Sequence, residues 1–235
     1  GHNAGKEVTT GVRNTLIGGL AGDALTTGGY NVAIGYLALS AEDGNGRNVA
    51  IGNNTLMTQN AGSEAYNVAI GFAAGEAVTT GNENVLIGGL AGDALTTGGN
   101  NTAIGKNALS SEDAGSYNVA VGTNALSAQD AGDAYNVAVG SNAGQNVTSG
   151  IRNTLIGGLA GDALTTGGLN VAIGHQALGA EDEHGRNVAI GYEALISLNA
   201  GADAYNVAVG FNAGLSMSTG ANNTLIGGQT GNALT

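Results

Sequence analysis

The chain has 235 residues, and Gly, Ala and Asn together account for close to half of them. It contains no Pro, Cys or Trp and only nine aromatic residues, which excludes a disulfide-stapled fold, a Cys-ligated zinc domain and one deep globular core. The net charge of −12 argues against nucleic acid as a partner, because phosphate binding needs clustered Lys and Arg. The hydrophobic content of 42% argues against disorder. The sequence contains no run of about 18 apolar residues, so no membrane-spanning helix is expected.

A five-residue motif, Asn-[Val/Thr]-[Ala/Leu]-[Ile/Val]-Gly, recurs thirteen times along the chain at spacings of 17–19 residues. Repetition at a fixed period is typical of solenoid proteins, in which each coil stacks on the next. We therefore expect one coil for each motif. The Asn residues that begin the motif form a predicted ladder: Asn14, Asn31, Asn48, Asn67, Asn84, Asn101, Asn118, Asn136, Asn153, Asn170, Asn187, Asn206 and Asn223.

Four coil types follow one another in chain order and then repeat. The first reads NTLIGGLAGDALTTGG from Asn14, the second carries the acidic turn Glu42-Asp43, the third is the longest, and the fourth ends in a Thr-Thr-Gly turn at residues 79–81. This larger unit spans about 70 residues. We expect a single β-solenoid array over residues 1–235, with superrepeats near residues 14–83, 84–152 and 153–222.

Both ends of the sequence fall inside a coil. Residues 1–5 align with residues 210–214, and residues 231–235 align with residues 22–26. Solenoids need capping repeats at their ends, and neither end resembles one. The sequence is therefore expected to be a fragment of a longer array.

Each motif predicts a short β-strand. Alternate residues of a strand point to opposite faces, so residues 30–36 place Val32 and Ile34 on one face and Asn31 and Ala33 on the other. The β-branched pair favours a strand. Within the thin interior we expect Val and Ile, while the flat Asn/Ala/Gly face is left over for close association of copies. The reverse assignment, with Val and Ile at a subunit interface, is the alternative.

A second short segment follows each motif, as at Ala38-Leu39. We therefore expect two short strands and two turns in each coil of the array. A three-stranded hexapeptide coil would need an aliphatic residue every six positions, and from Ile34 that period meets Ser40 and Gly46. The Asn column is expected to hydrogen-bond its neighbours above and below and the local backbone.

The repeated motif and the Ala-Leu or Ala-Gly that follows it resemble, over the whole chain, the YadA-like head repeats of trimeric autotransporter adhesins. Similar repeats occur in tail-fibre and structural proteins of bacterial viruses. The resemblance implies a left-handed parallel β-roll, three chains around a long axis and a role in surface adhesion. The coils are longer than the familiar head repeat and form a four-coil superperiod, which favours a virion fibre.

The position before each Asn of the ladder holds all four Arg and five of the seven Tyr. Neighbours one coil apart are placed to stack Arg on Tyr. We expect edge packing that closes the coil, and the alternative is a ridge that binds a glycan or protein of a host surface. This candidate ridge comprises Arg13, Tyr30, Arg47, Tyr66, Tyr117, Tyr135, Arg152, Arg186 and Tyr205.

Acidic turns recur once in every four coils, at residues 42–43, 112–113 and 181–183. We expect solvated loops that keep fibres soluble, with calcium binding as the alternative, because carboxylates and turn carbonyls suit that ion. No catalytic residue, metal site or cofactor is expected, since His2, His175 and His184 recur with no Ser or carboxylate partner at a fixed offset.

The sequence thus predicts a non-enzymatic structural or adhesive fibre segment that mediates or supports attachment to a cell surface. A phage tail fibre or filament is favoured, and the head of a bacterial trimeric autotransporter adhesin is the alternative. A calcium- or ice-binding β-solenoid is the alternative from another class. The expected location is extracellular, on a virion or a bacterial surface. The expected partners are the chain itself, as a homo-trimer, and a host-surface glycan or protein.

Overall fold

The computed structural model describes residues 1–234 and is all-β, as predicted. The chain divides into two compact units, which meet in sequence between Tyr117 and Asn118. The first unit holds β1 (Thr15–Ile17), β2 (Val32–Ile34), β3 (Val49–Ile51), β4 (Val68–Ile70), β5 (Val85–Ile87) and β6 (Thr102–Ile104). The second holds β7 (Val119–Val121), β8 (Val137–Val139), β9 (Thr154–Ile156), β10 (Val171–Ile173), β11 (Val188–Ile190), β12 (Val207–Val209) and β13 (Thr224–Ile226).

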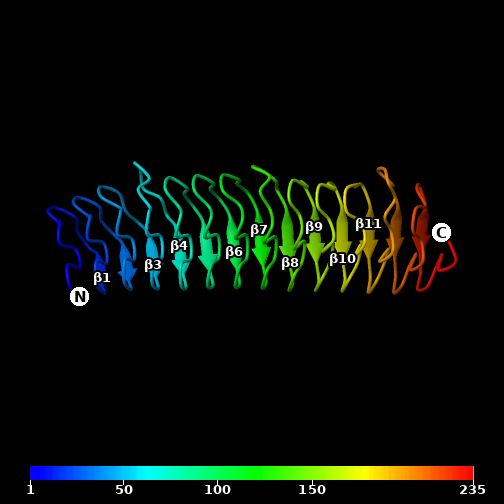
Figure 1. The fold of residues 1–235 in the computed structure, drawn as a ribbon, viewed down its shortest axis with the longest axis horizontal. Coiled ribbons are helices and arrows are strands. Elements are labelled where there is room, and N and C mark those ends of the chain that lie inside the picture. Colours follow the sequence, from blue (N-terminus) through cyan, green and yellow to red (C-terminus); the bar gives the residue numbers. More distant parts are fainter. Residues whose placement is uncertain (235) are drawn as a thin grey trace. The chain divides into compact units, whose positions relative to one another are not determined.

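Within each unit the strands stack in chain order, and each strand pairs in parallel with the next (Figure 1). The register is residue for residue: β2 pairs with β3 through Val32 with Val49, Ala33 with Ala50, and Ile34 with Ile51. Each turn of the solenoid therefore contains one strand, and the predicted β-solenoid is confirmed. The described residues hold no helix of the length and apolarity needed to cross a membrane.

Backbone geometry limits each strand to three residues. Tyr30, two positions before β2, adopts a left-handed φ of 62°, and Gly35, directly after β2, has a φ of 140°. A Cβ atom at Gly35 would collide with the carbonyl oxygen of Gly52 in the following coil. Only glycine fits there, because the position combines an unusual φ with close approach of another backbone.

The predicted second strand of each coil is wrong. The segment that includes Ala38-Leu39 is a turn, and both Leu37 and Leu39 are left-handed, with φ of 55° and 54°. A chain that alternates into the left-handed region cannot remain extended. The segment instead reverses the chain within a few residues and directs Leu39, which is fully buried, into the coil.

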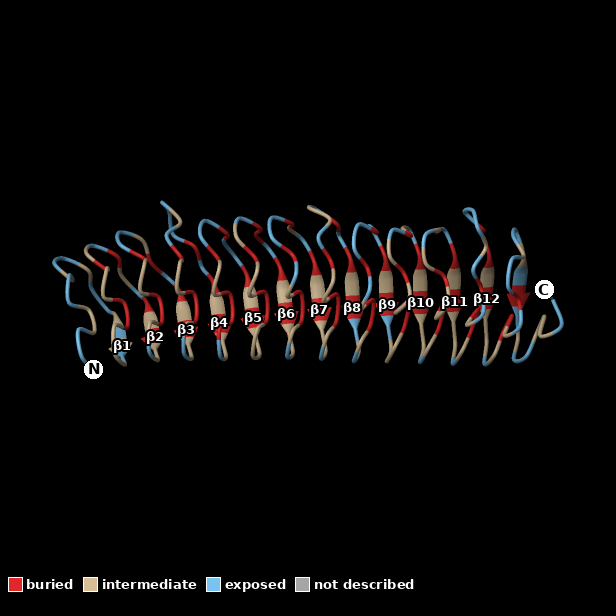
Figure 2. Ribbon diagram, in the orientation of Figure 1, coloured by how far each residue is buried: buried red, intermediate tan, exposed pale blue. Residues whose placement is uncertain are grey.

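The prediction that Val and Ile point into the coil is also wrong. The opposite face of each strand points inward, which is the alternative assignment. Ala33 is fully buried, whereas Val32 and Ile34 on the same strand are only half-buried (Figure 2). The interior of the coils is therefore lined mainly by Asn, Ala and Leu, and the β-branched residues of the strands point outward. A narrow coil has room for Ala opposite one Leu, and the Asn amides must reach backbone groups inside it.

Candidate functional site

The Asn ladder is a chain of side-chain to backbone hydrogen bonds that links successive coils. The backbone N–H of Asn31 donates to Oδ1 of Asn14 at 2.9 Å, and the N–H of Asn48 donates to Oδ1 of Asn31 at 3.0 Å. On the other side of the amide, Nδ2 of Asn84 donates to the carbonyl oxygen of Gly98 at 3.0 Å. The Asn84 amide therefore binds the backbone N–H of Asn101, which begins the following coil, and the carbonyl of Gly98 near the end of its own coil.

The ladder lies inside the coils and is shielded from solvent. From Asn31 to Asn206 the exposed fraction of every ladder residue is at most 1%. A buried polar group must find hydrogen-bond partners, and the amide side chain supplies both a donor and an acceptor. These Asn residues therefore act in folding, and their side chains are out of reach of a ligand.

Part of the candidate ridge in the first unit forms a continuous ladder of stacked side chains. The guanidinium carbon of Arg13 lies 5.1 Å from the ring centroid of Tyr30, and that of Arg47 lies 4.9 Å from Tyr30 and 5.6 Å from Tyr66. Arg47 also forms an ion pair with Glu64, which accepts a 2.9 Å hydrogen bond from the hydroxyl of Tyr66. The hydrogen bonds from Tyr66 and Arg47 hold the pKa of Glu64 below its usual range.

In the second unit a Leu interrupts the ridge. Arg186 stacks on Tyr205 at 5.5 Å and pairs with Asp203 at 2.7 Å, but Leu169 occupies the ridge position one coil before Arg186. The remaining ridge residues, Tyr117, Tyr135 and Arg152, share the left-handed backbone of this position. Tyr rings along the ridge remain about half exposed, at 44% for Tyr30 and 51% for Tyr66. The ridge therefore presents accessible ring edges, while its stacked guanidinium groups are engaged in contacts within the chain.

A second column of rings lies in the second unit, five residues after the ladder Asn. His175, Tyr192 and Phe211 stack in sequence with ring centroids 5.5 Å apart and planes inclined by 13°. Tyr192 and Phe211 are 45% and 54% exposed. The stacking covers the inner ring faces, so this column supports neighbouring coils and presents ring edges to solvent.

The acidic turns are only partly solvated, which corrects the sequence-based expectation. Glu42, Glu112 and Glu181 are fully buried, whereas Asp43, Asp113 and Glu183 are exposed and Asp182 is half-buried. Each buried carboxylate accepts a hydrogen bond from the backbone N–H three residues later, as between Glu42 and Asn45 at 3.1 Å. Burial raises the pKa of Glu42 and of Glu181. The signal missed in the sequence is that Glu42 lies one coil after Leu25 and two coils before Val78, both in interior positions.

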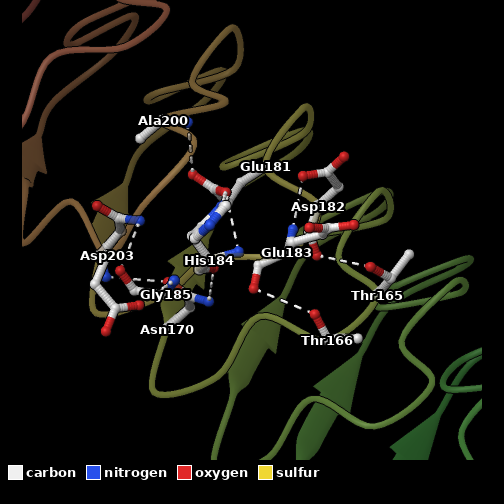
Figure 3. Close-up of polar contacts among 11 residues, drawn as sticks. Thr165, Thr166, Asn170, Glu181, Asp182, Glu183, His184, Gly185, Ala200 and Asp203 are labelled. Atoms are coloured by element: carbon white, nitrogen blue, oxygen red, sulfur yellow. Dashed lines mark hydrogen bonds and ion pairs between the residues drawn. The ribbon is translucent and has the colours of Figure 1, made fainter.

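The third acidic turn brings together three groups that can ligate a metal ion, although no metal site was expected. One ligand atom from each of Glu181, Asp182 and His184 lies within 4.8 Å of the other two (Figure 3). Within residues 1–234 no other group of three or more His, Cys, Asp and Glu side chains gathers in this way. Within the described residues, the side chains that could bind a metal ion together are therefore found at one turn of the second unit.

Comparisons with known proteins add no assignment to this geometry. No protein-family model, curated protein or solved structure matches the chain. The part of the chain that the structure describes also contains no pocket. The exposed surfaces of the coils are therefore the features that can contact a partner.

Proposed function

We propose that this chain is a structural or adhesive segment of an extracellular fibre, in which three copies associate as an extended trimeric β-roll. The observation that carries the proposal is the outward direction of the β-branched residues. We define the outer strand face as the first and third residues of every strand: positions 15, 17, 32, 34, 49, 51, 68, 70, 85, 87, 102 and 104 in the first unit and 119, 121, 137, 139, 154, 156, 171, 173, 188, 190, 207, 209, 224 and 226 in the second.

The outer strand face is apolar and only half-covered by its own chain. All of its members are Val, Ile or Thr, and none is fully buried. Between the first and last strands its members are half-buried, except Val139 and Ile156, which are exposed at 36% and 37%. Parallel sheets are normally covered on both faces, and a contiguous exposed apolar surface marks an interaction site. A second copy of the chain offers the same columns at the same spacing, which favours self-association.

A cyclic arrangement of copies explains how such a face is covered without open-ended growth. Closed symmetric oligomers bury the same patch of every copy around one axis. Three copies are proposed because the motif resembles the trimeric head repeat, and three copies bring each outer strand face toward a common axis. The interior of the coils is full, so rigidity and length are the properties that this segment contributes to a fibre.

The candidate ridge supports an adhesive role over a passive spacer role. Its Tyr rings are half-exposed and lie on a different part of the coil from the outer strand face. Aromatic rings with a polar hydroxyl are common in recognition surfaces for sugars and proteins. We place the binding surface at the ridge, on either a phage tail fibre or a bacterial adhesin head.

Analytical ultracentrifugation of the 235-residue chain tests the assembly. We expect three chains in each particle, and we expect Ile51→Asp combined with Ile70→Asp to dissociate it, because the two carboxylates would be buried without partners. Thr80→Asp, on an exposed turn, is the control that should leave the trimer intact. Circular dichroism verifies folding of all three proteins. A monomeric wild-type chain would contradict the proposal.

A cell-binding assay tests adhesion separately. We expect the triple variant Tyr66→Ala, Tyr135→Ala and Tyr205→Ala to lose most of its binding to a panel of bacterial cells while it retains the wild-type oligomeric state. If a correctly assembled triple variant binds as well as the wild type, the ridge is not the adhesive surface. If the wild type binds no cells in the panel, the spacer role is favoured over the adhesive one.

A further inference from the structure

The third acidic turn differs from ordinary acidic loops because its first carboxylate lies inside the solenoid. Glu181 is fully buried, and its Oε1 accepts a hydrogen bond from the N–H of His184 at 3.2 Å. Its Oε2 faces the N–H of Ala200 in the following coil at 3.4 Å (Figure 3). The carboxylate is therefore held in place by backbone groups of two coils.

The imidazole of His184 lies next to this carboxylate but makes no hydrogen bond with it. Nδ1 of His184 is 3.7 Å from Oε1 of Glu181, and Nδ1 is a buried atom without a hydrogen-bond partner. An unpaired buried nitrogen destabilises the fold unless something satisfies it. Histidine nitrogen is also the most common protein ligand for transition metals. The unsatisfied nitrogen thus points to a ligand between the two side chains.

Within residues 1–234, no Lys or Arg forms an ion pair with the carboxylates of this turn. Asp182 lies beside Glu181, and its Oδ1 accepts a hydrogen bond from the N–H of Glu183 at 2.7 Å. Arg186, the closest Arg or Lys in sequence, forms its ion pair with Asp203 at 2.7 Å. A divalent cation bound at this turn would neutralise the carboxylates and satisfy the imidazole together.

From this arrangement we infer that Glu181, Asp182 and His184 form a binding site for a divalent first-row transition ion, with Zn²⁺ as the representative. Zinc accepts imidazole nitrogen and carboxylate oxygen together, at about 2.0–2.2 Å, whereas calcium selects oxygen ligands alone. The ligand atoms lie within 4.8 Å of one another, and the side chains of Asp182 and His184 are partly exposed, so these two side chains can rotate toward one ion. The inference does not depend on the proposed fibre function.

The two earlier acidic turns of the same chain provide the comparison. Glu42 and Glu112 are buried in the same way and accept the same backbone hydrogen bond, from Asn45 and Gly115. The position that holds His184 is therefore Asn or Gly in the other two turns. The inference is that the imidazole at this position decides whether an acidic turn binds a transition ion.

Isothermal titration calorimetry with ZnCl₂ on the full 235-residue chain tests the inference. We expect about one equivalent of Zn²⁺ for each wild-type chain and at least tenfold weaker binding by His184→Asn. That variant reproduces the turn at Asn45, so it should fold as the wild type does. His175→Asn, which removes an exposed imidazole from the ring column, is the matched control and should bind like the wild type.

The gain-of-function variant Asn45→His makes the test independent of any loss of folding. It builds the same three ligands around Glu42 and Asp43, so we expect about two equivalents of Zn²⁺ for each chain. Wild-type affinity in His184→Asn, or no heat of binding in the wild type, would overturn the site. A folded Asn45→His chain that still binds one equivalent would overturn the assignment of the deciding role to the imidazole.

Discussion

Two adjacent coils of the first unit fill their interiors with a Leu side chain that comes from the strand in one coil and from the turn opposite the strand in the other. In the coil that begins at Asn84, the strand supplies the buried Leu86 and the turn supplies Gly92. In the next coil the strand supplies Ala103 and the turn supplies the buried Leu109. The backbone at the two turn positions is the same, with φ of 56° at Gly92 and 54° at Leu109.

The difference shows that these two coil types place one large and one small residue at the two positions, and that either position can hold the large one. A Cβ atom built at Gly92 would lie 2.8 Å from Cδ2 of Leu86, and its three nearest atoms all belong to that side chain. Close-packed interiors tolerate exchanges that keep the total volume and penalise those that change it. A large strand residue therefore requires a small turn residue, and the opposite pairing works equally well.

The largest loss of stability is expected from changing the ladder Asn, which both coil types share. Asn84→Ala removes an acceptor for the N–H of Asn101 and a donor for the carbonyl of Gly98. Leaving two buried backbone groups unpaired should lower the free energy of unfolding by about 4 kcal/mol. Guanidinium unfolding followed by circular dichroism measures this loss. A loss below about 1 kcal/mol would show that water or a neighbour replaces the amide.

Leu86→Ala should be the next most destabilising change. It removes one of the two buried Leu side chains of the Asn84 coil, the other being Leu95, and should reduce the free energy of unfolding by about 3 kcal/mol. Ile87→Ala, on the outer strand face of the same strand, is the control. In the isolated chain it should reduce stability by about 1 kcal/mol, because Ile87 is only half-buried. Equal losses at the two positions would contradict the assignment of inner and outer faces.

Gly92→Leu tests the pairing directly. Alone, it should destabilise the chain by about 2 kcal/mol, since the new side chain overlaps Leu86. Combined with Leu86→Ala it rebuilds the pattern of the following coil, so the double variant should be more stable than the sum of the single losses by about 2 kcal/mol or more. If the losses in the free energy of unfolding of the two single variants simply add in the double variant, residues 86 and 92 do not compensate for each other.

The smallest expected effect is a change in the pH dependence of stability when Glu42, a buried polar residue, is replaced. Burial raises its pKa above the ordinary value of 4.5, so the unfolded chain loses this proton at lower pH than the folded chain does. The stabilising contribution of the protonated carboxyl is full below pH 4.5 and is lost as the pH rises through the folded pKa. Glu42→Gln should therefore remove part of the decline in stability above pH 4.5.

Unfolding curves at intervals from pH 4 to pH 7 check this expectation. Gln is a suitable replacement because Gln59 occupies the corresponding position one coil later and is buried there. Asp43→Asn, at the exposed neighbour, is the comparison variant: it removes only the smaller, coulombic contribution of Asp43 to the raised pKa of Glu42, so it should change the slope less than Glu42→Gln does. A steeper decline in Glu42→Gln than in the wild type would show that the buried carboxylate is stabilised in its charged form.

The repeat alone located every strand of the array. The motif beginning at Asn31 predicted the strand that the structure places at Val32–Ile34, and the same offset holds at Asn187 and Val188–Ile190. Positions in the candidate ridge were also evident, because residues one coil apart must lie side by side in a solenoid. The stacking of Arg47 between two Tyr rings follows from that spacing and from the attraction of guanidinium to aromatic faces.

Which face of each strand points into the coil was decided only by the tertiary structure. Alternation separates Val32 and Ile34 from Asn31 and Ala33, but a period of two is the same for either orientation. The coil is too narrow for both β-branched residues, and the ladder amides need backbone partners that exist only inside. The left-handed turn that directs Leu39 inward was hidden for the same reason, since Leu at such a φ is rare outside a packed coil.

What the sequence determined by itself is the period, the parallel stacking and the column to which each residue belongs. What only the tertiary structure decided is which columns are inside, and with them the burial of Glu181 and the unpaired nitrogen of His184. The physical reason is that periodicity reports spacing along the chain, whereas burial depends on the width of the coil. That width is set jointly by the turns, the Asn hydrogen bonds and the paired volumes of opposite walls.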